Sequence, residues 1–240
     1  MNKLAALEAW AGHLKCMNCS VRKLSLFADL NQQDFDLIHQ PIDELDYDTG
    51  ETIYQMTDSP TYVYTIRSGL VKLVHDLPNG TYRIVRIVRQ GDIAGIEALN
   101  GTAYLQDAIT LLPTSVCRIP REEIERLNNK SPRLCKQLTA RWHQAISDAD
   151  TWLSELNTGT SRRRVSSFLL YLDENKHLDH KKHSEACYIP SREDIGAVLA
   201  ITTETSSRII AEFRRKNWIT VNGNTAIINR AALQSVLLKE

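Results

Sequence analysis

The spacing of apolar residues changes along the chain, and the change separates a β-rich region from helical regions. Between about residues 46 and 119, apolar residues come in short runs that are rich in Val, Ile and Tyr. Turn-forming sequences such as Pro78-Asn79-Gly80 and Gln90-Gly91-Asp92 separate the runs. Many short strands at this spacing predict a sandwich or barrel. The expected strands are residues 52–54, 62–66, 70–75, 82–89, 108–112 and 115–119.

One short helix is expected on each side of this region. Residues 31–39 have helical spacing before it, and residues 120–127 have helical spacing after it. The second segment begins with Pro120 and continues with Glu122 and Glu123. Proline suits the first position of a helix, and acidic side chains suit its first turn.

A longer periodic segment follows, and it predicts a helix that pairs with a second copy of the chain. Its apolar residues are separated by alternating steps of three and four, which is the a/d spacing of a coiled coil. Pro132 and Gly159 bound a helix of about 25 residues. A helix packed on its own β domain would also explain an apolar stripe, but two large Trp side chains favour a dimer. The expected dimer interface is Leu138, Trp142, Ala145, Ala149, Trp152 and Leu156, preceded by Cys135.

The last third of the chain has a helical pattern. Residues 161–175 carry apolar side chains at helical spacing, and the polar residues 176–186 are expected to form a loop. Ser191 then precedes Asp194 by three residues, as in a helix-capping box. A helix is therefore expected to begin here and to run to about Leu199.

The following residues complete a winged helix. A second helix over residues 203–216 is expected after a short turn, with the small Gly196 and Ala197 where the two helices cross. Asn222-Gly223 readily takes the positive φ angles of a type I′ turn, so residues 219–228 are expected to form a β-hairpin. A helix-turn-helix with an appended hairpin is a winged helix.

Polar side chains at the start of the second helix are suited to reading bases. Glu204, Ser207 and Arg208 are spaced i, i+3, i+4, so they share one face, which a recognition helix presents to the major groove. An exposed intrahelical pair between Glu204 and Arg208 is the structural alternative. The opposite side of the helix is expected to pack inward through Ile209, Ile210 and Phe213. Further DNA contacts are expected from Thr203, Ser191, Arg192 and Arg214, with Arg215 and Lys216 nearby for phosphates.

Charge is distributed unevenly, although its sum is zero. The chain has 29 basic and 29 acidic residues in 240, which by itself argues against a nucleic-acid-binding protein. Up to Gly159, however, 16 basic residues face 20 acidic ones, and after it 13 face 9. The net positive part is therefore the part that contains the winged helix.

Other classes of protein find little support in the sequence. No apolar run is long enough to span a bilayer and no secretory leader is visible, so a cytoplasmic protein is expected. Phosphate-binding loops, nucleophile elbows and zinc-protease motifs are all missing, so an enzyme is not expected. Five cysteines at uneven spacing do not form a disulfide framework and indicate metal binding or thiol chemistry.

The order of these parts resembles the Crp/Fnr family of bacterial transcription regulators, and most closely its oxygen-responsive Fnr branch. The resemblance extends from Cys16 to about Leu233, and the Glu-x-x-Ser-Arg pattern at Glu204 is its branch-specific part. The matching segments are residues 64–69 (YTIRSG), 91–95 (GDIAG), 114–120 (TSVCRIP), 195–199 (IGAVL) and 203–208 (TETSSR).

The resemblance implies an α+β fold with three parts. These are an N-terminal double-stranded β-helix, or cupin-like β-roll, within residues 1–130, a dimerisation helix over 131–159, and a winged helix-turn-helix domain over 160–240. It also implies a homodimeric transcription regulator that reads a palindrome with TTGAT-like half-sites, contacts RNA polymerase and controls oxygen- or redox-responsive genes.

The same resemblance implies a [4Fe–4S] cluster held by three N-terminal cysteines and one internal cysteine. Cys16, Cys19 and Cys117 match three of these positions, but Ser25 occupies the third N-terminal position. A hydroxyl is a poorer iron ligand than a thiolate, and Asp29 or His13 is a candidate replacement. A cluster, a thiol or disulfide switch and a cysteine set with no sensing role remain open. Cys135 and Cys187 are expected to be structural or incidental.

Two further alternatives concern the β-roll. The cyclic-AMP branch carries an Arg-Ser pair for the cyclic phosphate, whereas residues 95–108 contain Glu97 but no Arg, and Asp107 would repel a phosphate. Cyclic AMP is therefore not expected, although another small effector is an alternative signal. A β-roll signalling dimer that does not bind DNA is the alternative from a different class of protein.

Overall fold

The protein's structure is a computed structural model, and it describes residues 16, 19, 21–174 and 185–238. They form two compact units. The first unit contains the residues up to Val74 and the segment Ile87–Ala145. The second contains the hairpin segment His75–Arg86 and the residues from Ile146 onward. The three-part division into residues 1–130, 131–159 and 160–240 remains a prediction.

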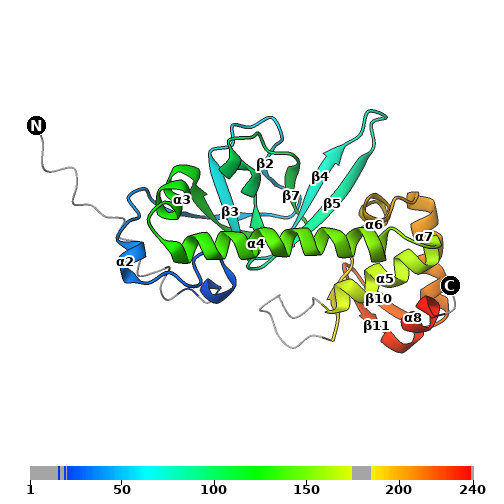
Figure 1. Cartoon of the computed structure of the whole chain (residues 1–240). Coiled ribbons are helices and arrows are strands. Elements are labelled where there is room, and N and C mark those ends of the chain that lie inside the picture. The colour runs from blue at the N-terminus through cyan, green and yellow to red at the C-terminus, as the bar shows by residue number, and fades with distance from the viewer. Residues whose placement is uncertain (1–15, 17–18, 20, 175–184, 239–240) are drawn as a thin grey trace, which may run out of the picture. The chain divides into compact units, whose positions relative to one another are not determined.

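Two four-stranded sheets form the β-roll (Figure 1). The strand pairs β1–β8, β3–β8, β3–β6, β2–β7 and β4–β7 are antiparallel. Consecutive strands alternate between the sheets, except that β4 and β5 are neighbours in one sheet. The hairpin between β4 and β5 carries the segment that belongs to the second unit. One sheet has the order β1 (Asp43–Tyr47), β8 (Thr114–Pro120), β3 (Tyr62–Ser68), β6 (Ile93–Ala94), and the other has the order β2 (Thr52–Tyr54), β7 (Asp107–Thr110), β4 (Leu70–Asp76), β5 (Tyr82–Arg89).

Aromatic rings fill the space between the sheets. The ring of Tyr54 stacks on that of Tyr104 with centroids 4.1 Å apart and on that of Tyr64 at 5.4 Å. Tyr54 and Tyr64 come from different sheets, and the Tyr104 hydroxyl donates a 2.7 Å hydrogen bond to the carbonyl of Tyr62. The six predicted strands are present with shifted ends, whereas the short β1 and β6 were not expected.

Short helices surround the β-roll and lead into the long helix. The predicted helix over 31–39 is a single turn, α2 (Gln32–Phe35), which begins with a capping box between Asn31 and Asp34. The predicted helix over 120–127 is α3 (Arg121–Asn128). The remaining helical elements are η1 (Arg22–Leu24), η2 (Ile96–Asn100), α4 (Pro132–Thr151) and the π-helical turn η3 (Trp152–Leu156).

The second unit contains a winged helix. A three-stranded sheet in the order β10, β11, β9 packs with four helices, of which α8 was not expected. Gly196 is required where α6 meets the turn, because a Cβ atom there would lie 2.7 Å from the carbonyl oxygen of Ile201. The elements are α5 (Ser161–Glu174), β9 (Cys187–Tyr188), α6 (Arg192–Leu199), α7 (Thr203–Arg215), β10 (Ile219–Asn222), β11 (Thr225–Ile228) and α8 (Arg230–Leu237).

The expected fold class is therefore confirmed: a β-roll, a long helix and a winged helix-turn-helix. Most of the predicted loop over 176–186 lies outside the described residues. Among the helices that the structure describes, none is both long and apolar enough to cross a membrane.

Candidate nucleic-acid interface and thiol pocket

Helix α7 is fixed by side chains at its start and along its buried face. The N-cap Thr202 hydroxyl accepts a 3.1 Å hydrogen bond from the backbone N–H of Thr205, which satisfies one free donor of the first turn. The hydroxyl of the buried Ser206 donates a 2.6 Å bond to the carbonyl of Arg192, at the start of α6. The expected inward residues Ile209, Ile210 and Phe213 are buried.

Helix α6 has a hydrogen-bonded start of its own. The Ser191 hydroxyl accepts a 3.0 Å bond from the backbone N–H of Asp194 and donates a 2.9 Å bond to its carboxylate. The Tyr82 hydroxyl, in the hairpin segment of the same unit, donates a 3.0 Å bond to the other carboxylate oxygen. Burial and the Asp194 charge raise the pKa of Tyr82. Ser191 is thus engaged in capping, while Tyr82 and Ser206 are structural contacts that the sequence did not indicate.

The predicted base-reading residues lie on the free face of α7. Glu204, Ser207 and Arg208 are all exposed. Within the part of the chain that the structure describes, no ion pair joins Glu204 to Arg208. The alternative of an intrahelical pair therefore has no support, and the carboxylate, hydroxyl and guanidinium all remain available for a partner. Their role in base reading stays a prediction.

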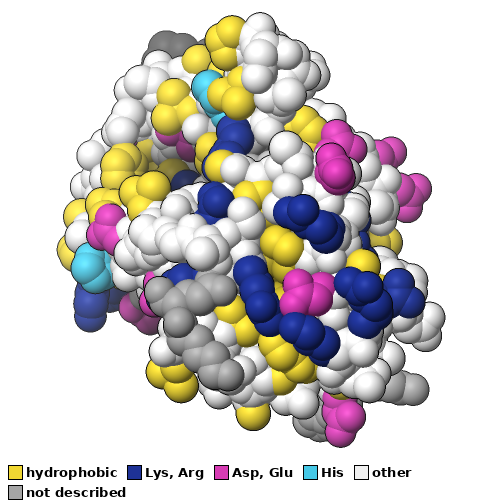
Figure 2. Space-filling model, turned by 90° about the vertical axis from the view of Figure 1, so that its right-hand side faces the viewer, with side chains coloured by type: hydrophobic (Ala, Val, Ile, Leu, Met, Phe, Trp, Pro, Cys, Tyr) yellow, Lys and Arg dark blue, Asp and Glu magenta, His cyan; other side chains and the backbone are white. Residues whose placement is uncertain are grey.

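Basic side chains lie beside this face. The pKa of Arg192 is lowered, first by burial and then by the charge of Arg214, so two guanidinium groups lie close enough to repel each other. Such a pair favours an anion between or above its members. Lys216, by contrast, is 2.7 Å from Glu212 in an intrahelical pair. Figure 2 shows Lys and Arg side chains gathered on the face of the molecule seen there.

The residues of the expected dimer seam differ in exposure: the first four are accessible, and the last two are buried. In the first unit, Leu138 and Trp142 line a groove with Cys135 beside α3, and the side chain of Trp142 is 37% exposed. Ala145 is half-buried and Ala149 is exposed. These residues are accessible to a second chain.

Trp152 and Leu156 differ from the open residues of the expected seam, and their part in a dimer interface stays a prediction. Both are buried within the second unit, where the Trp152 ring packs edge-on against Phe168 at 6.3 Å and Tyr171 at 5.8 Å. The π-helical turn that begins at Trp152 changes the 3.6-residue period, so the heptad spacing does not continue through it. The large exposed apolar side chains near the end of α4 are instead Ile146 and Leu153.

Three cysteines lie around one small cavity in the first unit. Cys16, Cys19 and Cys117 line it together with Ser25 and apolar side chains. Burial raises the pKa of Cys16 to about 11, and the neighbouring Cys19 thiol adds to this. Burial and the Cys16 thiol raise the pKa of Cys117 to about 12. At neutral pH both thiols are therefore protonated and weak as nucleophiles or ligands. Cys135 is exposed and Cys187 is buried elsewhere.

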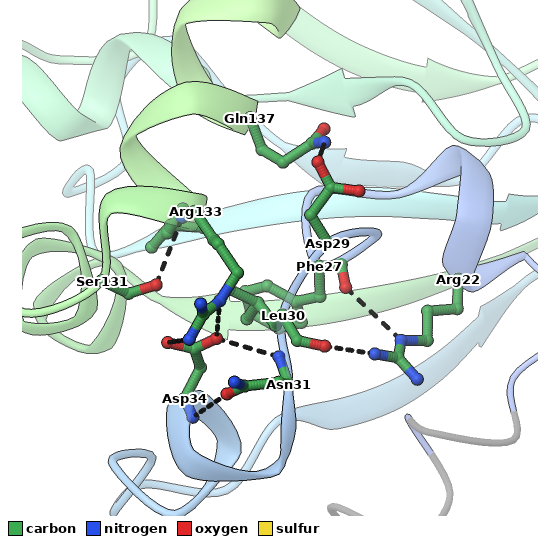
Figure 3. Close-up of polar contacts among 10 residues, drawn as sticks. Arg22, Phe27, Asp29, Leu30, Asn31, Asp34, Ser131, Arg133 and Gln137 are labelled. Carbon is green, nitrogen blue, oxygen red and sulfur yellow. Dashed lines mark hydrogen bonds and ion pairs between the residues drawn. The ribbon is translucent and has the colours of Figure 1, made fainter.

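The described residues do not fit a four-ligand iron–sulfur cluster. The Ser25 hydroxyl donates a 2.9 Å bond to the carbonyl of Arg22 and accepts a 3.4 Å bond from the N–H of Phe27, so its oxygen closes a turn. The Asp29 carboxylate accepts a hydrogen bond from Gln137 (Figure 3). No three His, Cys, Asp or Glu side chains among the described residues are grouped to hold a metal ion. His13 lies outside those residues.

The residues at the expected effector position have structural partners. The Asp107 carboxylate accepts a 2.7 Å hydrogen bond from the backbone N–H of Met56. The Glu97 carboxylate accepts a 3.3 Å bond from the N–H of Leu105. Both carboxylates are therefore engaged with the backbone of the β-roll. The expectation that cyclic AMP does not bind stays a prediction.

Two family models match the chain, one in each of its halves. The model described as a cyclic nucleotide-binding domain matches residues 44–131. The model described as a Crp-like helix-turn-helix domain matches residues 163–236. The matched segments contain the β-roll and the winged helix.

Known relatives cover most of the chain. The fumarate and nitrate reduction regulatory protein of Vibrio cholerae is 27% identical over 93% of this chain and 90% of its own length. The transcriptional activator FnrA of Stutzerimonas stutzeri is 26% identical over 87% of this chain and 86% of its own. FixK2 of Bradyrhizobium japonicum has a solved structure that is 26% identical, with a TM-score of 0.71, and the match covers 81% of this chain and 96% of that one. These relatives are regulators of transcription and not enzymes.

Proposed function

Because the chain belongs to the Crp/Fnr family of DNA-binding transcription regulators, we propose that it reads a palindrome with TTGAT-like half-sites through Glu204, Ser207 and Arg208. The observation that carries this proposal is the division of α7 into two faces. Three hydrogen-bonding side chains are exposed on one face, and the other face is buried against the rest of the unit through Ile209 and Phe213. A recognition helix needs both properties.

Phosphate contacts position such a helix on the duplex. Arg192 and Arg214 are suited to this, because their mutual repulsion is relieved when an anion binds. The exposed Thr203 contributes from the first turn of α7, where backbone N–H groups favour a phosphate. Ser191 acts through its capping of α6. Once bound, the regulator contacts RNA polymerase.

Equilibrium titration of duplexes tests this function. A fluorescent duplex with two TTGAT half-sites about one helical turn apart, roughly 34 Å, is compared with a duplex of the same composition in which the half-sites are scrambled. We expect tighter binding to the palindrome and a steep loss of affinity with rising salt, since each neutralised phosphate releases counterions. Equal affinity for both duplexes at every salt concentration would contradict sequence-specific reading.

We also propose that the working form is a homodimer joined along α4. The exposed Trp142 and Ile146 on α4 support this, because large exposed apolar side chains favour a second chain as partner. Leu153, in the π-helical turn that follows α4, is exposed as well. No charged residue occurs among the expected seam positions, so a dimer needs no added group to overcome repulsion. Light scattering in air at micromolar concentration should give a dimer, and monomer alone would contradict it. Trp142→Asp should shift the equilibrium toward monomer.

Finally, we propose that the regulator responds to redox state through the thiols of Cys16, Cys19 and Cys117. These three share one cavity, and the position that would complete a thiolate set is occupied by Ser25. Oxidation of two thiols to a disulfide by oxidised glutathione passes two electrons to that reagent, which leaves as two molecules of glutathione. We expect operator affinity to change on this treatment and to recover with a reducing agent.

Iron and sulfide analysis of anaerobically purified protein distinguishes this thiol response from a cluster. We expect neither iron nor sulfide in stoichiometric amount. We also expect no visible absorption band that disappears on exposure to air. Stoichiometric iron and sulfide would overturn the thiol assignment.

A further inference from the structure

The turn between α6 and α7 contains a strained residue. Among the residues that the structure describes, the non-glycine residues with positive φ are Ala200, at 54°, and Asn217, at 53°. Asparagine adopts this left-handed conformation readily because its short polar side chain forms local hydrogen bonds, whereas alanine has no such compensation. Ala200 is exposed, so packing of its methyl group does not hold it there. Other contacts of the turn therefore maintain the strain.

The conformation of Ala200 matters because the two helices are so close in the chain. Only residues 200–202 separate α6 from α7. The left-handed residue directs its own backbone N–H and that of Ile201, the second at 3.2 Å, to the carbonyl of Gly196, which is a common way of ending a helix. Thr202 follows as the N-cap of α7. The turn at Ala200 therefore sets the direction in which α7 leaves.

Two guanidinium groups bind the end of α6 next to this turn. Arg164, from α5, donates a 2.7 Å bond to the carbonyl of Leu199. Arg83, from the hairpin segment of the same unit, donates a 3.4 Å bond to the carbonyl of Val198. The last carbonyls of a helix have no partner within the helix, and positive charge is favourable at that end. The two bonds thus hold the last turn of α6 directly before Ala200.

The carbonyls of α6 explain why two like charges lie together here. Burial lowers the pKa of Arg83, and the charge of Arg164 lowers it further, so the two guanidinium groups repel each other. Arg163, the preceding residue of α5, donates a 2.7 Å bond to the carbonyl of Leu237, the last residue of α8. Neighbouring arginines of α5 therefore form the same kind of bond at the ends of two different helices, and Arg164 is the one that contacts α6.

We propose that Arg164, with a smaller contribution from Arg83, is a positioning residue for α7, because its bond to Leu199 holds the strained turn at Ala200. The difference between the two arginines follows from their bond lengths of 2.7 and 3.4 Å. Loss of the Arg164 bond lets Ala200 relax toward negative φ, which redirects Glu204 at the start of α7. The effect on DNA reading rests on the proposed function, whereas the support of the turn does not.

The test uses the full chain and measures two quantities. The first is the ratio of the affinities for the palindromic and the scrambled duplex at one salt concentration, in which the sequence-independent phosphate contribution cancels. The second, without DNA, is the amide hydrogen exchange of peptides that contain residues 199–203, read by mass spectrometry. Arg164→Ala should lower the affinity ratio several-fold and accelerate the exchange. Arg83→Ala should change both quantities in the same direction, but less.

Rescue distinguishes positioning from a general loss of stability. Glycine adopts a φ near 54° without strain. Ala200→Gly, introduced into Arg164→Ala, should therefore bring the affinity ratio and the exchange back toward their native values, although the guanidinium is still missing. Arg164→Lys keeps a positively charged donor at the end of α6 and should stay closer to the native values than Arg164→Ala. It also provides a measurement if Arg164→Ala folds poorly.

Arg163→Ala is the matched control, because it removes the same charge and the same kind of bond from α5. It should leave the affinity ratio and the exchange of residues 199–203 unchanged, and equal losses in Arg163→Ala and Arg164→Ala would overturn the positioning role.

The other outcomes decide the remaining parts. Native exchange of residues 199–203 in Arg164→Ala would refute the support of the turn. No recovery with Ala200→Gly would contradict the role of strain. If the native chain bound both duplexes equally, the proposed function would fail, and the exchange measurements would still decide whether Arg164 supports the turn.

Discussion

The exposed face of α7 and the thiol cavity keep their reactive groups in opposite environments. On α7 the charged side chains of Glu204 and Arg208 are in water, and only the residues behind them are buried. In the cavity the thiols of Cys16 and Cys117 are partly buried and protonated. A polyanion therefore meets charged side chains in water on α7, whereas burial opposes ionisation of the two cavity thiols. We propose the first region for reading DNA and the second for a response to redox state, and the two environments predict different pH dependence.

The largest expected effect concerns the buried side of α7, which packs against the rest of the second unit and leaves Glu204, Ser207 and Arg208 exposed. Phe213 is completely buried, and Phe213→Ala should lower the free energy of unfolding of the second unit by about 3–5 kcal/mol. Denaturant titration followed by circular dichroism measures it. Loss of operator binding should accompany the loss of stability. If Phe213→Ala had the native free energy of unfolding, packing of Phe213 would not be what holds α7 in place.

The next effect concerns the cavity. Because the pKa of Cys16 is about 11 and that of a free thiol is about 8.5, its thiolate fraction near pH 8 should be reduced roughly a hundredfold or more. Alkylation of Cys16 should keep accelerating between pH 8 and pH 11, while that of a short cysteine peptide used as reference levels off earlier. The same pH profile for Cys16 and for the peptide would contradict the difference between the regions.

These raised pKa values also affect stability, with a definite sign. The unfolded chain loses the thiol protons of Cys16 and Cys117 at lower pH than the folded chain does. Their contribution is therefore fully present below about pH 8.5 and decreases as the pH rises toward 11. Denaturant titrations of the native chain and of a Cys16→Ala variant at pH 7 and pH 10 measure this contribution. We expect the free energy of unfolding of the first unit to depend less on pH in the variant.

A smaller effect is expected on α7 itself. Arg208→Ala should weaken operator binding by about 1–3 kcal/mol per lost base contact and should relax the preference at that position. Arg121→Ala, in the other unit, removes an arginine that pairs with Glu125 and serves as the control. Retention of the full preference for the palindrome by Arg208→Ala would refute its role.

The smallest effect concerns the turn that the Ser25 hydroxyl closes beside the cavity. Ser25→Ala removes the bond to the Arg22 carbonyl and should cost about 1 kcal/mol of stability. The same change should raise the exchange of residues 22–34 in hydrogen-exchange measurements. If residues 22–34 kept the native protection from hydrogen exchange in Ser25→Cys but lost it in Ser25→Ala, the size of the side chain rather than its hydrogen bond would explain why serine is needed at position 25.

Local patterns predicted much of this molecule because they report interactions between near neighbours. The turn residues placed the strands, the Ser191 box placed the start of α6, and i, i+3, i+4 spacing placed Glu204, Ser207 and Arg208 on one face. The heptad spacing predicted α4, but it did not predict the π-helical turn that buries Trp152 and Leu156. Period alone does not distinguish a contact with a second chain from the contact of Trp152 with Phe168.

The sequence by itself determined the order of the elements, the exposed face of α7 and the departure at Ser25, since each depends on residue type and short spacing. Tertiary structure alone decided that Ser206 contacts the start of α6 and that Asp34, Asp29 and Ser25 contact α4. These contacts join residues about fourteen to more than a hundred positions apart. No local period encodes such pairs, because packing of the whole unit selects them.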